Sequence, residues 1–227
     1  MLEGFFNLFY PKRCRICGNF SKSILCLNCK DSFSIIEPPI CKRCGKPCNI
    51  EVNVCRDCRN RFKFSTARSL GFYEGALKNA IHEFKYRNGR GLAKIFAGLM
   101  AGIIDDFEDV DLITYVPLSR KKQLKRGYNQ AHLLAGEIAK KTGLICDSIL
   151  IRVNEEMDQT KLSPEQRRRN VRRAFIFDEK KNISGKSLLL IDDVFTTGST
   201  VDECSKVLYA KGAKKVSVLT IARVCNI

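Results

Sequence analysis

The stretch GKSLLLIDDVFTTGST, residues 185–200, decides how the fold of this sequence is interpreted. Its Gly-Lys-Ser invites comparison with the phosphate loop of P-loop nucleotide hydrolases. That loop needs another glycine five residues before the glycine of the Gly-Lys-Ser, and the whole loop follows a strand. Lys180 stands where that glycine would be, and the apolar run Leu188 to Ile191 comes after the Gly-Lys-Ser. The sequence therefore excludes a P-loop.

The second half of the stretch indicates a different phosphate site. Four apolar residues predict a buried strand that ends at Asp192 and Asp193, at the edge where α/β sheets bind ligands. The next turn leads into a helix whose free amides and hydroxyl side chains can cradle a phosphate, and Gly198 permits close backbone approach. The two carboxylates can hold a sugar diol or a hydrated magnesium ion. Together these features predict a site for a ribose 5-phosphate.

Strands and helices alternate from residue 64 onward. We expect strands within residues 66–75, 111–118, 149–152, 187–194 and 215–222, and helices at residues 75–86, 92–107, 130–142 and 199–211. A basic loop at residues 119–129 and a polar, mobile loop at residues 155–175, with a helical turn after Ser163, complete the prediction. The alternation predicts an α/β fold in which helices flank both faces of a parallel sheet.

Cysteines form a module near the start of the chain. Nine of the twelve lie between residues 14 and 58, and eight of these form four C-x2-C pairs. A C-x2-C turn presents two thiolates to one ion, and two such turns complete a tetrahedral zinc site. The expected zinc ligands are Cys14, Cys17, Cys26, Cys29, Cys41, Cys44, Cys55 and Cys58.

Sequential pairing gives one site from the first four cysteines and another from the last four, and interleaved pairing stays open. Cys48 is a spare thiol that could replace a neighbour. We expect one or two ions. Four protein ligands leave no position for a catalytic water, which makes the metal structural. We therefore divide the chain into a zinc-binding module, residues 1–62, and a second domain, residues 63–227.

The formal net charge is +16, and two zinc tetrathiolates would lower it to about +12. A charge of this size favours a polyanionic partner, because lysines and arginines placed on phosphates release counterions. The sequence has no signal-peptide pattern and no apolar run of ~20 residues. Its cysteines are not distributed as in a protein with structural disulfides. We therefore expect a cytoplasmic protein without an integral membrane segment.

The order of motifs along nearly the whole chain resembles the ComF family, also described as GntX-like or as competence protein ComFC. The motifs are the four C-x2-C pairs, FKY at residues 84–86, VPLSRKKQLKRGYNQA at residues 116–131, then Gln159, Leu162, Arg167 and Asn170 ahead of AF at residues 174–175, and DDVFTTGST at residues 192–200. The last is similar to the phosphoribosyl pyrophosphate (PRPP) motif of type I phosphoribosyltransferases. The resemblance implies a phosphoribosyltransferase-like fold with an N-terminal zinc finger, in a protein that handles single-stranded DNA during natural transformation.

By this resemblance Asp192 and Asp193 are the catalytic pair and hold the ribose hydroxyls. The remaining PRPP-binding residues, with Mg²⁺ accompanying the ligand, would be Thr196, Thr197, Gly198, Ser199, Thr200 and Arg126. A flexible loop with Gln159, Lys161 and Arg167 would close over the site. The first hypothesis is a DNA-handling protein on a PRPP-binding phosphoribosyltransferase scaffold. The alternative is an active phosphoribosyltransferase, similar to the amidophosphoribosyltransferases, with an unknown acceptor.

Two basic clusters are candidates for a nucleic-acid surface. They are Arg120, Lys121, Lys122 and Lys125 in one cluster, and Arg168, Arg169, Arg172 and Arg173 in the other. We expect both at one edge of the sheet, where they would bind single-stranded DNA, and a solvated charged face is the alternative. The expected partners are PRPP, single-stranded DNA and other competence proteins.

Overall fold

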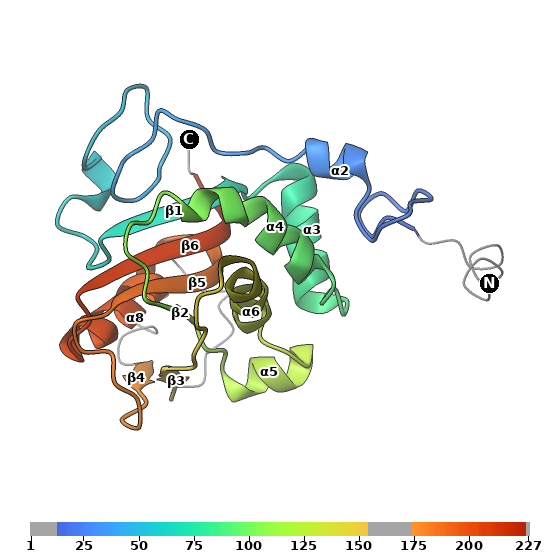
Figure 1. Cartoon of the computed structure of the whole chain (residues 1–227). Helices are drawn as coiled ribbons and strands as arrows, with labels where there is room; N and C mark the ends of the chain where they lie inside the picture. Colours follow the sequence, from blue (N-terminus) through green and yellow to red (C-terminus); the bar gives the residue numbers. More distant parts are fainter. Residues whose placement is uncertain (1–12, 154–173, 226–227) are drawn as a thin grey trace.

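The computed structural model describes residues 13–153 and 174–225. At its centre lies a four-stranded parallel sheet in the order β1-β6-β5-β2 (Figure 1). The strands are β1 (Thr66–Phe72), β2 (Leu112–Tyr115), β5 (Ser187–Phe195) and β6 (Lys215–Arg223). The predicted α/β fold, with a parallel sheet and an N-terminal cysteine-rich module, is confirmed.

Strands β5 and β6 are the two inner strands, and both faces of each are buried. Leu188 and Leu190 pack in one apolar cluster, whereas Leu189 and Ile191 pack in the cluster on the opposite face. Side chains alternate between the two faces of a strand, so a strand covered on both sides reads as a continuous apolar run. This explains why LLLI in the deciding stretch carries no polar alternation.

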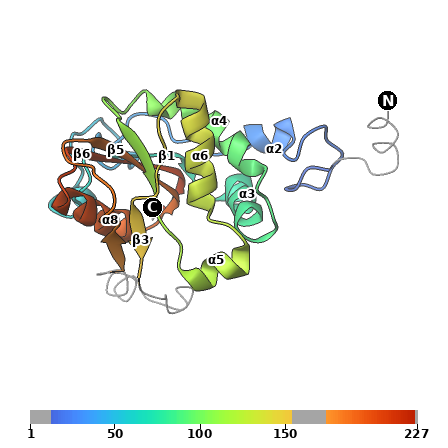
Figure 2. The same ribbon diagram turned by 60° about the horizontal axis from the view of Figure 1, so that its bottom comes forward.

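Helices cover both faces of the sheet (Figures 1 and 2). Helices α3 (Gly75–Tyr86), α4 (Leu92–Ile104) and α6 (Gln130–Thr142) pack on one face. Helix α8 (Ser199–Ala210) packs on the other, next to a two-stranded antiparallel sheet formed by β3 (Leu150–Arg152) and β4 (Phe175–Phe177).

Two parts of the secondary-structure prediction were wrong. Residues 119–129 contain helix α5 (Arg120–Arg126), whose Ser119 side chain accepts from the Lys122 amide and whose end is marked by Gly127 in the left-handed conformation. Ser119 and Gly127 are typical capping residues. We did not predict a helix between them, because the charged run that they enclose has almost no apolar periodicity. Strand β3 pairs with β4, which we did not predict, and does not join the parallel sheet. Most of the predicted mobile loop lies outside the described residues.

The cysteine-rich module forms two ribbons that contact different parts of the domain. The first contains the short helix α2 (Leu27–Asp31), and its buried Cys14 and Leu25 pack in the cluster formed by α3 and α4. The second contains the 3₁₀ turn η1 (Arg56–Cys58) and packs in the cluster on the α8 face. In Figure 1 these ribbons lie at opposite ends of one blue segment.

None of the helices in the described part of the chain is long and apolar enough to cross a membrane.

Candidate functional site

The carboxyl end of β5 carries the two adjacent aspartates that the sequence predicted. Both side chains are partly exposed, and the Asp193 amide donates to Asp192 Oδ1 at 2.8 Å. Burial raises the pKa of Asp192 to about 7, and the neighbouring charge of Asp193 adds to the shift. Two carboxylates held this close at the end of a buried strand favour a cationic or hydroxyl-bearing ligand.

A lysine from a different element already meets this pair. Lys85, in the last turn of α3, places its Nζ atom 2.8 Å from Asp193 Oδ1, and each side chain is 15 % exposed. Burial by itself would lower the pKa of Lys85, but the charge and hydrogen bond of Asp193 outweigh it and raise that pKa. Lys85 is the middle residue of FKY at residues 84–86, one of the motifs that resemble the ComF family, and the motif by itself predicted no role for it. An ammonium that close to the aspartates is a site residue which sequence reasoning missed.

Helix α5 and strand β3 bring further cations to the same place. Lys122 is half-buried, and its pKa falls to about 8, first because of burial and then because of the charges of Arg152 and Arg126. Its titration also responds to Asp193 and Lys85, so these groups share one electrostatic environment. Repulsion among cations that the fold holds together is relieved when an anion binds.

Arg126 is ordered by its neighbours rather than extended into solvent. It donates to Gln130 Oε1 at 2.9 Å and to the Tyr86 hydroxyl at 3.2 Å, and its guanidinium lies 4.9 Å from the Tyr86 ring centroid. Asn129 caps α6, because its side chain accepts from the amides of Ala131 and His132. The RGYNQ motif therefore builds the turn that places Arg126 at this edge of the sheet.

The phosphate loop predicted at residues 196–200 connects β5 to α8. The Thr197 and Ser199 hydroxyls lie 2.8 Å apart, and the Ser199 amide donates to Thr197 Oγ1 at 3.4 Å. The N-cap of α8, Gly198, offers no side chain to the amides that follow. Unsatisfied amides at a helix start bind anions. Thr196 is exposed, and Thr200 is partly buried in the first turn of α8.

Gly198 is required for two reasons that the sequence alone did not show. Its φ angle is +75°, and a Cβ atom would lie 2.6 Å from Phe195 and 2.7 Å from Phe62. We expected close approach of a ligand to this glycine, whereas the structure shows close approach of two aromatic rings. One of those rings belongs to the end of the cysteine-rich segment.

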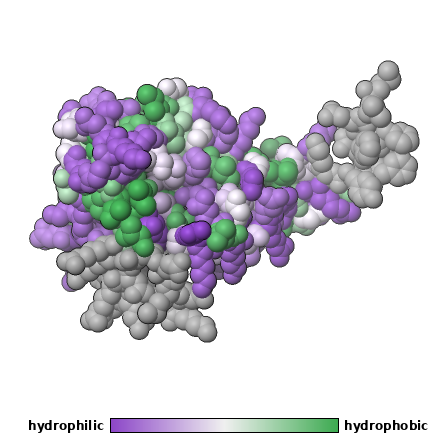
Figure 3. Space-filling model, turned by 90° about the horizontal axis from the view of Figure 1, so that it is seen from below, coloured by the Kyte–Doolittle hydropathy of each residue, from purple (hydrophilic) through white to green (hydrophobic). Residues whose placement is uncertain are grey.

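Three residues of the first predicted DNA cluster are exposed on α5, namely Arg120, Lys121 and Lys125, whereas Lys122 is half-buried. Figure 3 views the side on which α5 lies in Figure 1, and hydrophilic side chains cover much of its described surface. The other predicted residues lie outside the described residues: Gln159, Lys161, Arg167, Arg168, Arg169, Arg172 and Arg173.

The eight paired cysteines form two tetrads. Cys14, Cys17, Cys26 and Cys29 make one, and Cys41, Cys44, Cys55 and Cys58 make the other, with the ligand atoms of each within 4.8 Å of one another. The Cys17–Cys26 and Cys41–Cys58 Sγ distances are 3.7 Å, and the Cys44–Cys55 distance is 3.5 Å. Sulfurs about 2.3 Å from a central zinc in tetrahedral geometry would be about 3.8 Å apart.

The tetrads therefore fit structural zinc, held by four thiolates with no position for water. Cys48 lies outside both tetrads, and its thiol donates to the Lys46 carbonyl at 3.3 Å.

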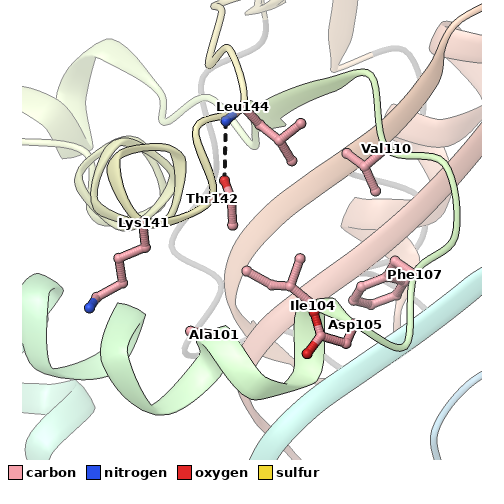
Figure 4. A pocket seen from close by; sticks show the side chains of 8 residues that line it. All are labelled: Ala101, Ile104, Asp105, Phe107, Val110, Lys141, Thr142 and Leu144. Atoms are coloured by element: carbon pink, nitrogen blue, oxygen red, sulfur yellow. Dashed lines mark hydrogen bonds between the residues drawn. The ribbon is translucent and has the colours of Figure 1, made fainter.

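A hollow of about 570 Å³ lies at the other end of the fold, between the C-terminal ends of α4 and α6 (Figure 4). Its lining is Ala101, Ile104, Asp105, Phe107, Val110, Lys141, Thr142 and Leu144. None of the site residues described above lines it, so the hollow is separate from the aspartate edge of the sheet.

Comparison with known proteins gives matches over most of the chain. Residues 5–64 match the family described as Double zinc ribbon domain. Competence protein ComFC of Bacillus subtilis is 32 % identical over 213 residues, covering 88 % of this chain and 84 % of that protein. Competence protein F of Haemophilus influenzae is 30 % identical over 227 residues, covering 95 % and 98 %. DNA utilization protein YhgH of Salmonella typhimurium is 31 % identical over 192 residues, covering 81 % and 84 %.

Solved structures with a related arrangement include glutamine PRPP amidotransferase from B. subtilis, with a TM-score of 0.42 and 21 % identity over 61 % of this chain and 30 % of that one. A hypoxanthine phosphoribosyltransferase from Staphylococcus aureus gives a TM-score of 0.36 and 17 % identity over 61 % and 69 %.

Proposed function

Since the chain belongs to the ComF family of competence proteins, we propose that it binds single-stranded DNA through an exposed basic surface and holds a phosphorylated ribose, PRPP, at the carboxyl end of β5. The relatives named competence protein and DNA utilization protein support the first part. The ion pair of Lys85 with Asp193, and the presence of Lys122 in the same electrostatic environment, carry the second.

The DNA-binding surface that we propose is the exposed side of α5. Arg120, Lys121 and Lys125 project there, and the chain has a formal net charge of +16. Lysines and arginines on a strand's phosphates release counterions, which makes binding sensitive to salt and tolerant of sequence. Exposed Leu124 and Tyr86, 77 % and 50 % accessible, lie on the same region of α5 and the adjoining end of α3. Such side chains can pack against unstacked bases.

The test is fluorescence anisotropy of a labelled oligonucleotide with the wild type across a salt series. We expect replacement of Arg120, Lys121 and Lys125 by alanine to weaken binding and to reduce the slope of log K against log salt by about 2, near 0.7 for each lost contact. The control replaces Lys180, Lys186 and Lys214, which are exposed near the amino ends of β5 and β6 and carry the same total charge. Absence of micromolar binding by the wild type at moderate salt would sink this function.

The PRPP site that we propose has two halves. The Thr197–Ser199 turn and the open start of α8 receive the 5-phosphate, and the aspartates receive the ribose hydroxyls. Lys85, Lys122 and Arg126 supply positive charge for the pyrophosphate. Mg²⁺ bound with the ligand would neutralise further pyrophosphate charge, and Asp192 and Asp193 are the described carboxylates that could hold its hydration shell.

Calorimetry with PRPP and Mg²⁺ tests this site directly. We expect binding by the wild type and its loss in the Asp192→Ala, Asp193→Ala double variant. The same double variant with unchanged DNA affinity would show that the two parts of the proposal are separate properties.

Turnover is a second candidate function, favoured by the intact aspartate pair beside a complete phosphate loop. In a phosphoribosyl transfer an acceptor attacks C1 of the ribose, the C1–oxygen bond breaks, and pyrophosphate leaves with the bonding electron pair. The lysines and arginine at this edge would stabilise the charge on the leaving group. Pyrophosphate release with bases, ammonia, nucleotides or DNA as acceptors tests it, and no release with any of them would leave a binding protein.

A further inference from the structure

The second ribbon of the cysteine-rich module touches the phosphate loop directly. Arg61, three residues after the zinc ligand Cys58, donates from Nη2 to the Thr197 carbonyl at 3.0 Å. Its guanidinium also lies 4.9 Å from the centroid of the Phe62 ring. A peptide C=O and the following N–H point in opposite directions, so this bond also fixes the direction of the Gly198 amide.

Aromatic packing joins the same two segments. Phe62 stacks on Phe64 with ring centroids 4.8 Å apart and meets Phe195 edge-on at 5.9 Å. Gly198 lies against Phe62 and Phe195 so closely that no Cβ fits. Displacement of the Phe62 ring would therefore remove one of the walls that hold the loop in its left-handed turn.

Hydrogen bonds of residues 61–63 connect the Phe62 ring to the tetrad of Cys41, Cys44, Cys55 and Cys58. The Arg61 amide donates to the Cys58 carbonyl at 3.3 Å, and the Arg43 guanidinium donates to the Phe62 carbonyl. The Lys63 amide donates to Asp202 Oδ1 in the first turn of α8 at 2.6 Å. The segment is thus held at one end by a zinc ligand and at the other by the helix that begins at the phosphate loop.

A buried arginine attaches the sheet to the same tetrad. Arg223, at the end of β6 and 6 % exposed, donates from Nη1 to the Cys44 carbonyl at 2.5 Å and lies 5.0 Å from the Phe195 ring centroid. A zinc tetrathiolate carries a net charge of −2, and a guanidinium beside it offsets part of that charge. The first tetrad, against α3 and α4, shows none of these links to the phosphate loop within the described residues.

We propose that the second zinc ribbon is a positioning element of the phosphate loop, that Arg61 is the positioning residue through which it acts, and that zinc in this ribbon raises the affinity for a phosphorylated ribose. This inference rests on the proposed PRPP site. The first ribbon has no such effect, which makes the two zinc ions unequal in function.

Arg61→Met is the decisive variant, because Arg61 is exposed and its removal leaves the core intact. Arg59→Met is the matched control: Arg59 is exposed, lies two residues away and makes none of the described hydrogen bonds to the loop. We expect Arg61→Met to weaken Mg²⁺-PRPP binding about tenfold in calorimetry, as for loss of one charge-assisted hydrogen bond. Arg61→Lys should recover part of the loss, and Arg59→Met should bind as the wild type does.

Hydrogen exchange without ligand supplies a second readout. We expect faster exchange of the amides at residues 197–200 in Arg61→Met and in Cys55→Ser, which removes a ligand of the second tetrad. Cys17→Ser, which removes a ligand of the first tetrad, should leave these amides unchanged. Equal exchange in all variants, or wild-type PRPP affinity in Arg61→Met, would overturn the inference while the PRPP site stands. A wild type that binds no PRPP would remove the proposed site, and the exchange arms would still decide whether the ribbon orders the loop.

Discussion

Lys85 and Asp193 lie 2.8 Å apart, Nζ to Oδ1, between the last turn of α3 and the carboxyl end of β5. The pair joins a helix on one face of the sheet to the strand that carries the predicted ligand site. It gives the aspartate edge a resident cation before any ligand arrives. The charge of Asp193 is thereby offset at a place where Asp192, next to it, has its pKa raised to about 7.

Replacing Lys85 by methionine should destabilise the protein by about 3 kcal/mol, because Asp193 is left without its cation in a largely buried position. We expect the Lys85→Met, Asp193→Asn double variant to recover most of this loss, since the carboxylate that Lys85 neutralises is removed together with the lysine. Urea unfolding of the wild type, the two single variants and the double variant measures the coupling. A coupling near zero would show that the ion pair contributes nothing to folding.

The raised pKa of Asp192 predicts a specific pH dependence. The unfolded carboxyl loses its proton near pH ~4, whereas the folded one keeps it until about pH 7. The folded state therefore binds more protons in that window, and stability falls as pH rises through it.

Asp192→Asn lacks this titration, so its free energy of unfolding should decline less between about pH 5.5 and 7.5, a range that keeps zinc bound. The measurement is urea unfolding of both proteins at several pH values. Parallel curves would contradict the shifted pKa.

Gly198→Ala should cost about 3 kcal/mol, because it adds left-handed strain to a clash with two rings. Gly185→Ala is the matched control, since Gly185 has a φ angle of +72° and no atom within 4 Å of an added Cβ. It should cost about 1 kcal/mol from strain alone. If both variants lose the same free energy of unfolding, the Phe62 and Phe195 rings move to accept the added methyl group at no cost. PRPP affinity should fall only in Gly198→Ala.

Zinc content should be two ions per chain, one for each tetrad, by elemental analysis of the purified protein. Removal with a strong chelator should unfold both ribbons, because few apolar side chains hold them and metal binding supplies their folding free energy. Circular dichroism follows the loss, and re-addition of zinc should restore the signal. A folded, zinc-free protein would contradict a structural role for the metal.

The sequence predicted the parts of this protein that depend on local patterns. C-x2-C spacing predicted the zinc ligands, and the apolar run before Asp192 predicted the central strand and the edge where it ends. The helix predicted at about residues 130–142 is α6, and the structure shows that Asn129 and Gly143 cap its two ends. The basic helix α5 was missed, since its capping signals enclose a charged run without apolar periodicity.

The tertiary structure alone decided which distant residues meet. Lys85 reaches Asp193 because α3 packs across the sheet, and Arg61 reaches Thr197 because the second ribbon packs behind the phosphate loop. Periodicity and spacing report how a residue relates to its chain neighbours. They do not report which helix end or ribbon the packing of the core brings to a given strand, and the electrostatics of this site depend on those encounters.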